Sequence, residues 1–363
     1  MSHSPIDTPA LGDALNRYGP TSGRPRPNET RRLDSRTVDI HAHVAIAEAA
    51  AYMRPFIDLS RIALAHFANE PTREVNLEQE RNRGFAMSDP DDRLKVLDAQ
   101  GIDIQVVAPP PFQCYYQSPS EECIKGSRMV NDGLVAWVGR RPDRFAALGT
   151  LPMSDPDEAL NELERCMGPL GMKGVEVLTN IDGEELASPR FEQVWKKAEA
   201  LGALVMIHPN GFTHGERFRD YYFSNVVGNP LETTLALHHL IFSGTLERYP
   251  GLKILAVHGG GYLPSYAGRV DHAWGARQDC NASLPHPPTH YLRKIWFDSV
   301  VFSTHQLEYL VKAYGADKIV MGSDYPFDMA DYDPVEHVVS SDALSDQEKA
   351  KVAGLTAAAL LGL

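Results

Sequence analysis

Two histidines separated by one residue, His41 and His43, lie in the apolar segment Val38–His43. Side chains two apart on a β-strand point to the same face, so both imidazoles can be directed at one point. Neutral imidazole is the commonest side-chain ligand for a divalent metal ion. An H-x-H pair by itself is more often structural than metal-binding, so this pair indicates a metal site only if further ligands accompany it.

Three further groups follow other apolar segments. His208 and His258 are the last residues of two such segments, and Asp324 follows a third within Gly-Ser-Asp. Three histidines and one carboxylate around one point suit a zinc-like ion with room left for water. With 14 histidines in the chain, one at a strand end is unremarkable. The coincidence of four histidines and one aspartate at equivalent positions favours a site, whereas the remaining histidines are assigned to packing or solvent.

Eight short segments rich in β-branched residues are predicted to be strands. Most are continuous apolar runs, which is typical of parallel strands covered on both faces. Segments with apolar residues three or four apart lie between them and predict amphipathic helices. The predicted strands are Val38–His43, Ile102–Pro109, Phe145–Leu151, Gly174–Leu178, Leu204–His208, Lys253–His258, Ile295–Val300 and Ile319–Gly322. This alternation predicts an α/β fold, a (β/α)8 TIM barrel, rather than an open sheet with a G-x-G-x-x-G turn, which is absent.

In such a barrel the catalytic residues gather at the C-terminal ends of the strands. Three connections that follow strand ends are long, at residues 44–88, 210–228 and 259–292. We expect these insertions to form the substrate pocket, a lid or a subunit contact. Residues 38–363 are predicted to form the barrel domain, and the Pro-rich residues 1–37 an N-terminal arm.

Composition excludes several classes of protein. The 363 residues are 43% hydrophobic, enough for a large core, and 35 Lys and Arg against 48 Asp and Glu give a net charge of −13. That charge disfavours nucleic acid and anionic membrane surfaces as partners. No apolar run is long enough to span a bilayer, and residues 1–37 lack the apolar centre of a signal peptide. We therefore expect a cytoplasmic protein, whose four cysteines, scattered without a C-x-x-C pair, are reduced thiols.

Six motifs occur in order along the chain. They are D-I-H-A-H at 39–43, R-F-A-A-L-G-T-L-P-M at 144–153, I-H-P at 207–209, V-H-G-G-G at 257–261, G-R-V-D-H at 268–272 and G-S-D-Y-P-F at 322–327. Together they make the sequence resemble the amidohydrolase superfamily. The resemblance is to the branch that contains 2-amino-3-carboxymuconate-6-semialdehyde decarboxylase and related non-oxidative aromatic-acid decarboxylases, and it covers roughly residues 38–363.

The resemblance implies one divalent metal ion per chain, usually zinc, with manganese as the alternative. Its implied ligands are His41, His43, His208 and Asp324. His258 is implied to be the acid/base that acts on metal-bound water. Relatives with two metals use a carboxylated lysine at the end of the fourth strand, but Lys173 precedes that strand here and its end reads Val177-Leu178-Thr179. We therefore expect a single-metal site.

Residues that would anchor a substrate are less clearly marked. A carboxylated substrate calls for an arginine, whose planar fork can bind a carboxylate through two hydrogen bonds. The resemblance assigns to Arg277 a place in the pocket of the neighbouring subunit of a homodimer, against the alternative of a solvated loop arginine. Arg81 and Arg83 lie near the register of the family's second arginine, and Asn210 replaces its tryptophan after H-P. Because these departures fall in the pocket, we expect the metal chemistry to be retained with a substrate other than aminocarboxymuconate semialdehyde.

Three functions remain open. The first is a metal-dependent, non-oxidative decarboxylase of a carboxylated aromatic or muconate-type acid, a small-molecule substrate, with His258 and Asp324 moving the proton to the carbon that loses its carboxylate. The second uses the same site to hydrolyse a lactone, a cyclic amide or a ring C–N bond. The third is a barrel that has lost catalysis and serves as a binding or scaffold protein, against which the intact ligand set argues.

Overall fold

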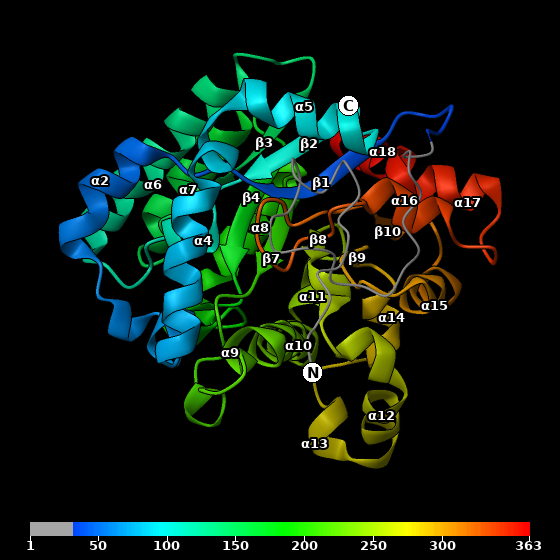
Figure 1. The fold of residues 1–363 in the computed structure, drawn as a ribbon. Helices are drawn as coiled ribbons and strands as arrows, with labels where there is room; N and C mark the ends of the chain where they lie inside the picture. The colour runs from blue at the N-terminus through cyan, green and yellow to red at the C-terminus, as the bar shows by residue number, and fades with distance from the viewer. Residues whose placement is uncertain (1–31) are drawn as a thin grey trace, which may run out of the picture.

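A computed structural model describes residues 32–363, so most of the predicted N-terminal arm at 1–37 lies outside the described residues. Eight parallel strands hydrogen-bond side by side in the order β1-β2-β3-β4-β7-β8-β9-β10. Figure 1 shows them in the middle of the molecule with the helices around them. The strands are β1 Val38–His43, β2 Ile104–Ala108, β3 Phe145–Thr150, β4 Gly174–Leu178, β7 Leu204–His208, β8 Lys253–Ala256, β9 Trp296–Asp298 and β10 Ile319–Val320.

The last strand returns to the first. The backbone amides of Ile40 and His43 on β1 donate to the carbonyls of Met321 and Tyr325, at 2.9 and 2.8 Å, just beyond the end of β10. Because these hydrogen bonds close the sheet on itself, the predicted (β/α)8 barrel is confirmed.

Some strands end earlier than predicted. β8 stops at Ala256, and His258 begins the short 3-10 turn η6 (His258–Gly260) instead of ending the strand. The next residues, Gly259 and Gly260, have φ angles of 63° and 77°, a conformation that favours glycine and turns the chain away from the sheet. A two-stranded hairpin, β5 (Asn180–Ile181) with β6 (Glu184–Glu185), was not predicted.

Helices cover the outside of the barrel and fill the insertions. The α-helices are α2 Ala47–Met53, α3 Ala63–His66, α4 Glu70–Ser88, α5 Pro90–Gln100, α6 Ser120–Val138, α7 Pro156–Met167, α8 Glu192–Leu201, α9 Phe223–Val226, α10 Gly228–Phe242, α11 Thr245–Arg248, α12 Leu263–Ala276, α13 Gln278–Asn281, α14 Pro288–Leu292, α15 Thr304–Tyr314, α16 Pro334–Val339, α17 Asp346–Ala350 and α18 Thr356–Leu361. The remaining short turns are η1 Arg54–Phe56, η2 Leu59–Arg61, η3 Pro111–Gln113, η4 Pro189–Phe191, η5 Gly215–Arg217 and the π-type η7 Lys351–Leu355. None of the described helices is both long and apolar enough to cross a membrane.

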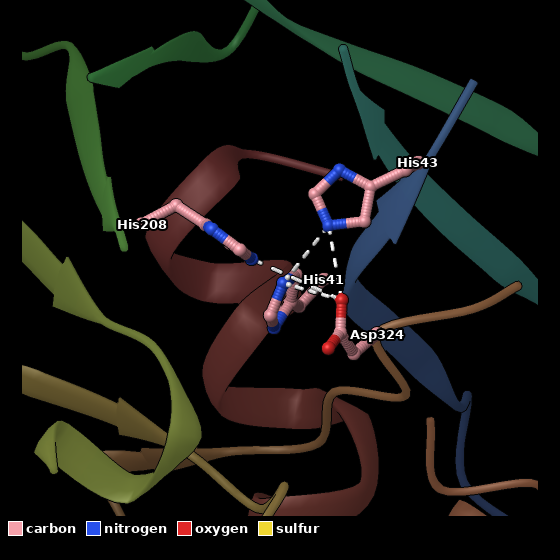
Figure 2. Close-up of side chains that lie close together, drawn as sticks. All are labelled: His41, His43, His208 and Asp324. Atoms are coloured by element: carbon pink, nitrogen blue, oxygen red, sulfur yellow. Dashed lines mark hydrogen bonds and ion pairs between the residues drawn. The ribbon is translucent and has the colours of Figure 1, made fainter. Parts of the chain in front are cut away.

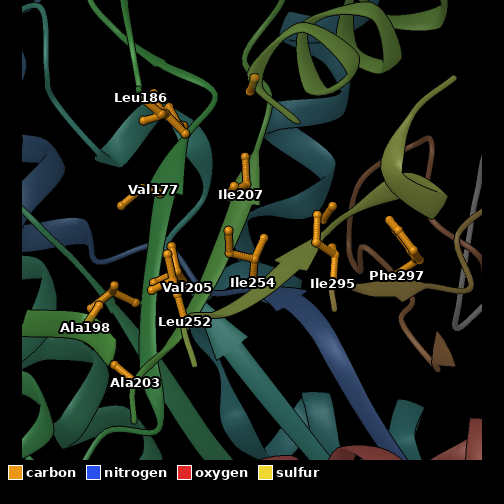
Figure 3. Close-up of a cluster of buried hydrophobic side chains, with 14 of the residues drawn as sticks. Val177, Leu186, Ala198, Ala203, Val205, Ile207, Leu252, Ile254, Ile295 and Phe297 are labelled. Atoms are coloured by element: carbon orange, nitrogen blue, oxygen red, sulfur yellow. The ribbon is translucent and has the colours of Figure 1, made fainter. Parts of the chain in front are cut away.

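The core has two layers, because alternate residues of each strand face opposite sides. On β7, Leu204 and Met206 belong to the cluster inside the barrel, which α18 closes at one end. Val205 and Ile207 belong to the outer cluster between the strands and the helices. Figure 3 shows these two side chains beside Val177 of β4 and other residues of that outer cluster. This packing fixes the direction of every side chain at the strand ends, including the polar ones.

The long connections at 44–88, 210–228 and 259–292 hold their own helices. The first contains α2, α3 and α4, the second α9, and the third α12, α13 and α14. Figure 1 shows α12 and α13 at the edge of the molecule, away from β1–β3. These segments surround the C-terminal strand ends, where the predicted ligands lie.

Candidate metal centre and its cavity

An extra residue in β1 directs His41 into the barrel. Asp39 is opposite Gln105 of β2 and Ala42 is opposite Val107, so three steps along β1 match two along β2. Such a β-bulge redirects the side chain at the extra position. Ile40 belongs to the interior cluster, and the His41 ring lies beside the ring of His208, which β7 also directs inward, with centroids 5.2 Å apart. The bulge therefore lets β1 contribute both His41 and His43 to one interior point.

The four predicted ligands meet there. His41, His43, His208 and Asp324 are buried, and their ligand atoms all lie within 4.8 Å of one another. Asp324 Oδ1 is 3.1 Å from His43 Nε2, 3.4 Å from His41 Nε2 and 3.9 Å from His208 Nε2. Figure 2 shows the three rings and the carboxylate directed at one another from β1, β7 and the segment that follows β10. Within residues 32–363, no other group of three or more His, Cys, Asp or Glu residues converges in this way.

Hydrogen bonds determine which ring nitrogen of each ligand histidine carries a proton and which keeps a lone pair for a metal ion. Each Nδ1 atom faces an oxygen that can only accept, so it must donate its proton, and the Nε2 atom keeps a lone pair. The acceptors are Asp298 Oδ2 at 2.7 Å from His41, the Pro109 carbonyl at 3.0 Å from His43 and the Pro209 carbonyl at 2.7 Å from His208. Outer partners of this kind orient metal-binding histidines. All three Nε2 lone pairs consequently face the same centre.

The charges of the group fit a cation. Burial acts to lower the pKa of His41, but the carboxylates of Asp324 and Asp298 outweigh it and raise this pKa to about 9, so a metal ion would displace a proton from this ring. Burial lowers the pKa of His43, and it lowers the pKa of His208 to about 3. Burial acts to raise the pKa of Asp324, but the adjacent histidines outweigh it and hold this pKa well below its usual range. His208 Nε2 has no hydrogen-bond partner although it is buried. Converging lone pairs, an ionised carboxylate and an unpartnered ring nitrogen fit a divalent metal ion with three nitrogen ligands and one oxygen ligand.

His258 lies on the other side of the Asp324 carboxylate. Its Nε2 atom is 3.2 Å from Asp324 Oδ2, whereas Oδ1 faces the three ligand histidines. Both residues have left-handed backbones, with φ of 55° at His258 and 60° at Asp324. Non-glycine residues rarely adopt this conformation, and it is concentrated at functional sites. The structure thus places the His258 ring beside the group of four candidate ligands and outside it.

A buried hydrogen-bond network holds β1 against the segment that carries Asp324. Asp39 accepts from the Ser323 hydroxyl at 2.6 Å and from the Gln105 amide at 2.7 Å. Gln105 in turn accepts from Arg93 of α5 at 2.8 Å, and Arg93 also donates to the carbonyl of His43. All four side chains are buried. The network therefore fixes the spacing between the H-x-H segment and Asp324.

Two acidic residues of the site were missed in the sequence. Asp298 at the end of β9 accepts from His41 Nδ1 and, through its other oxygen, from the backbone amide of Gly259 at 2.8 Å. Glu176 of β4 is fully buried, with Oε2 3.9 Å from His43 Nδ1, and burial raises its pKa well above the usual range. Each interrupts an otherwise apolar strand with a carboxylate, and that interruption was the available signal.

A cavity of about 600 Å³ opens beside His258 and Asp324. Helices α9, α10 and α12, together with the loop that follows β9, supply most of its wall. It contacts the residues that the sequence assigns to acid/base chemistry, so it is the candidate substrate pocket.

The arginines of α4 lie outside the cavity beside His258. The Arg83 guanidinium is 5.3 Å from the Phe327 ring centroid, and the Phe327 ring is tilted against the His43 ring, with centroids 5.0 Å apart. Arg83 lines a second cavity of about 380 Å³, where its Nη1 is 3.7 Å from Asp328. Arg81 is exposed. Neither arginine lines the cavity beside His258.

Asn210 and Arg277 also lie outside the cavity beside His258. Asn210 lines a third cavity, above the ends of β4 and β7, and its carbonyl accepts from Leu64. Arg277 follows α12, is largely exposed and binds Asp279 through two hydrogen bonds of 2.9 and 2.7 Å. Within its own chain, Arg277 does not reach the cavity beside His258.

The fold and this site together define a metal-dependent enzyme built on a (β/α)8 barrel, with its reactive groups at the C-terminal strand ends. The sequence profile of the amidohydrolase family matches residues 38–363. The chain belongs to the amidohydrolase family, which confirms the resemblance seen in the motifs.

Within the family, the chain is similar to several decarboxylases. The chain is 35% identical over 276 residues to the 2-amino-3-carboxymuconate-6-semialdehyde decarboxylase of Dictyostelium discoideum, covering 76% of this chain and 77% of that protein. The crystal structure of 5-carboxyvanillate decarboxylase from Sphingomonas paucimobilis superposes with a TM-score of 0.79 at 25% identity, covering 91% of this chain and 100% of the other. The Novosphingobium aromaticivorans 5-carboxyvanillate decarboxylase, solved with manganese and a nitrobenzoic acid, has a TM-score of 0.81 at 22% identity and covers 93% and 100%.

Proposed function

We propose that this protein is a metal-dependent, non-oxidative decarboxylase of a small aromatic or muconate-type carboxylic acid. The observation that carries the proposal is the arrangement around Asp324. One oxygen of this carboxylate lies 3.1 to 3.9 Å from the Nε2 atoms of three histidines. The other oxygen faces His258 at the wall of an open cavity. The decarboxylases among the relatives support the same chemistry.

A divalent ion held by the four ligands supplies the positive charge that stabilises the electrons left on the substrate when carbon dioxide departs. The chain's own residues supply the rest. His258 lines the cavity through a side chain that is 17% exposed, so its ring is within reach of a bound acid; Nε2 faces the Asp324 carboxylate. Asp324 Oδ2 accepts from that nitrogen and keeps the ring oriented. A carbon that loses its carboxylate beside His258 would receive its proton there.

We propose one metal ion per chain, since the described residues form a single ligand cluster. Three histidine nitrogens and one carboxylate suit zinc, which is our first choice. Manganese is the alternative, because a structural neighbour was solved with that ion. Elemental analysis distinguishes these cases, and two tightly held ions per chain would contradict the single-metal site.

The direct test is carbon dioxide release from a panel of acids by the metal-loaded enzyme. The panel contains hydroxybenzoates, aminobenzoates, nitrobenzoates, muconate semialdehydes and pyrone acids, with the corresponding lactones and cyclic amides as the hydrolase arm. We expect carbon dioxide from at least one acid, and no release after the metal is removed. Hydrolysis of a lactone or amide with no decarboxylation would overturn the proposal in favour of the hydrolase.

We also propose that the enzyme works in the cytoplasm, in line with its four unpaired cysteines, and that it is a homodimer in which Arg277 reaches the partner's pocket. If so, Arg277→Ala and His258→Ala damage the same pocket only when they come from different chains. After subunit exchange in a 1:1 mixture of the two inactive variants, about a quarter of the wild-type activity returns, because half of the dimers are mixed and each has one intact site.

Helix α12, which Arg277 follows, carries a second arginine that can be compared with Arg277 in the same experiment. Arg269 on α12 lies less than one helical turn beyond Tyr266, which lines the cavity, and it is exposed, with no ion pair among the described residues. Arg269→Ala is therefore mixed with His258→Ala in parallel. Recovery with Arg269→Ala but not with Arg277→Ala would move the shared arginine by eight positions along the chain and reject the assignment to Arg277.

A further inference from the structure

We propose, on the basis of the metal-dependent function above, that Arg93 is a positioning residue that couples helix α4 to the metal centre. Its guanidinium joins the end of α4 to the backbone of the ligand His43. Binding of a metal ion at the four ligands therefore orders α4, and α4 in turn strengthens metal binding.

The Arg93 guanidinium is buried where α4, α5, β1 and β2 meet. Arg93 belongs to α5 and has no exposed surface. Its Nε and Nη2 atoms both donate to the carbonyl of Ala86, near the end of α4. Nη2 also donates to the carbonyl of His43, and Nη1 donates to the side chain of Gln105, both at 2.8 Å. One planar group therefore links the end of α4 directly to a metal ligand.

Arg93 also contacts the segment that carries the carboxylate ligand. Its guanidinium carbon is 4.4 Å from the ring centroid of Tyr325, the residue that follows Asp324. A cation at this distance from an aromatic ring is attracted to it. The carbonyl of Tyr325 in turn accepts from the backbone amide of His43 at 2.8 Å. A shift of Arg93 would thus disturb both β1 and the segment after β10, which together supply three of the four ligands.

Little packing holds α4 along most of its length. The helix has 19 residues, and of the side chains that the structure describes in it, only those of Gln79 and Met87 are buried. Several others, from Thr72 to Arg83, line two cavities. Most of the stability of a helix in a protein comes from packing of an apolar face, so α4 has little stability of its own.

The C-terminal end of α4 is held by hydrogen bonds to its last carbonyls. The carbonyls of residues 86, 87 and 88 accept from Arg93, from the backbone amide of Ala45 and from the indole of Trp137. Two of these three donors depend on β1, because Ala45 follows that strand closely and Arg93 is bonded to His43. The order of α4 therefore depends on the position of the end of β1.

Occupation of the metal site fixes that position. With His43 held as a ligand, its carbonyl and the amide of Ala45 remain in place for the contacts that anchor α4. Such coupling is reciprocal, so the factor by which metal binding favours anchored α4 equals the factor by which anchored α4 strengthens metal binding. Helix α4 also borders the cavity of about 380 Å³ that contacts Phe327. The wall of this cavity is accordingly complete in the metal-loaded protein.

Hydrogen exchange of the α4 backbone, with and without zinc, is the direct test. We expect amides 74–88 to exchange at least about fivefold more slowly in the zinc-loaded protein, the lower end of couplings between sites. Equal exchange in the two states would overturn the coupling, whether α4 is mobile in both or protected in both. The second case would arise if a partner chain covered α4.

Arg93→Lys tests whether the planar fork carries the coupling. Lysine keeps the charge but replaces the fork by a single donor atom. Zinc affinity, measured by competition with a chelator, should fall about 10- to 100-fold, the scale for outer partners of metal ligands, and the zinc-dependent protection of α4 should be lost. The matched control is Arg144→Lys, because Arg144 also donates to two backbone carbonyls, those of Ile102 and Asp103. That variant should change neither property.

Trp137→Phe perturbs α4 without altering any atom bonded to His43, and it decides the question if Arg93→Lys does not fold. It removes the N–H that the Ser88 carbonyl accepts and keeps an aromatic ring. Because the coupling is reciprocal, loosening α4 should lower the zinc affinity about fivefold. Trp195→Phe, which removes an equally long indole hydrogen bond to the carbonyl of Leu186, should leave the affinity unchanged.

The remaining outcomes separate this coupling from the decarboxylase. Reduced zinc affinity in Arg93→Lys with the protection of α4 retained would overturn the coupling and leave Arg93 a structural role. Unchanged zinc affinity in both Arg93→Lys and Trp137→Phe would overturn it as well. None of these measurements uses a substrate, so failure of the carbon dioxide assay would reject the decarboxylase alone, whereas absence of metal binding would reject both.

Discussion

The two oxygens of Asp324 face two different kinds of surroundings. On the Oδ1 side, His41, His43 and His208 are at most 4% exposed, and each is fixed by a second hydrogen bond to an oxygen. On the Oδ2 side, His258 is partly exposed, and the wall beyond it comes from loops and helices that follow β7, β8, β9 and β10. The difference indicates that the sheet fixes the metal chemistry, whereas helices that can vary independently of the sheet determine which acid enters.

Removing a ligand on the buried side should have the largest effect. His208→Ala takes away one of three nitrogens and leaves an empty space in a rigid site, so metal and activity should be lost together. We expect activity to fall by on the order of a thousandfold or more, because a catalytic metal ion contributes several kcal/mol. Metal content by elemental analysis and carbon dioxide release measure the two effects. His239→Ala, an exposed histidine of α10, is the control and should change neither.

The buried side is also the side that could be predicted from sequence. The places of His41, His43 and His208 follow from a spacing of two in a strand and from positions at strand ends, and both rules depend only on backbone geometry. Their division from the acid/base candidate His258 came from the family resemblance. The β-bulge that directs His41 inward could not be predicted, because it depends on the register with β2. Asp298 and Glu176 were missed because their apolar neighbours indicated strands and the carboxylates among them were not followed up.

The residues on the Oδ2 side of Asp324, and the arginines proposed to bind a substrate, could not be predicted in the same way. Residues two apart on a helix face different directions, so Arg81 and Arg83 cannot be distinguished until the packing of α4 is known. In the structure Arg83 contacts Phe327, whereas Arg81 is exposed. The wall of the cavity beside His258 combines residues from four separate segments after β7, β8, β9 and β10, and nothing in their spacing brings them together.

His258→Ala tests the boundary between the two sides of Asp324, and we expect the second largest effect from it. His258 contacts Asp324 without joining the ligand set, so the variant should keep near-normal metal content. Its kcat should fall on the order of a hundredfold or more, the scale for removing a general acid or base. Loss of the metal in this variant would place His258 among the ligands and break the distinction between the two sides of Asp324.

Asp298→Asn should have an intermediate effect, because this residue serves both sides. One oxygen accepts from the His41 ring and the other from the backbone amide of Gly259, next to His258. An asparagine has one acceptor oxygen, so one of these donors must lose its partner. We expect metal affinity, measured by competition with a chelator, to fall about 10- to 100-fold, as for other outer partners of metal-binding histidines. An unchanged affinity would show that Asp298 does not hold the His41 ring in its metal-binding orientation.

Ser323→Ala should have the smallest effect and shows whether the network behind the ligands is structural or acts on the metal. The hydroxyl donates to Asp39 and accepts from the backbone amide of Tyr325 at 3.1 Å. Alanine leaves that buried amide unpartnered, which costs about 1–3 kcal/mol of unfolding free energy. Asp39 keeps its hydrogen bonds from Gln105 and from the backbone amide of residue 323.

Because Asp324 follows Ser323 directly, the network should also affect the metal. If it sets the distance between β1 and Asp324, the variant should bind metal less tightly, by up to about tenfold, which corresponds to 1.4 kcal/mol. Denaturant unfolding of the metal-free protein and chelator competition of the metal-loaded protein measure the two effects separately. Lower stability with unchanged metal affinity would confine the network to a structural role, and the rigidity of the buried side would then come from the hydrogen bonds at the Nδ1 atoms of the ligand histidines.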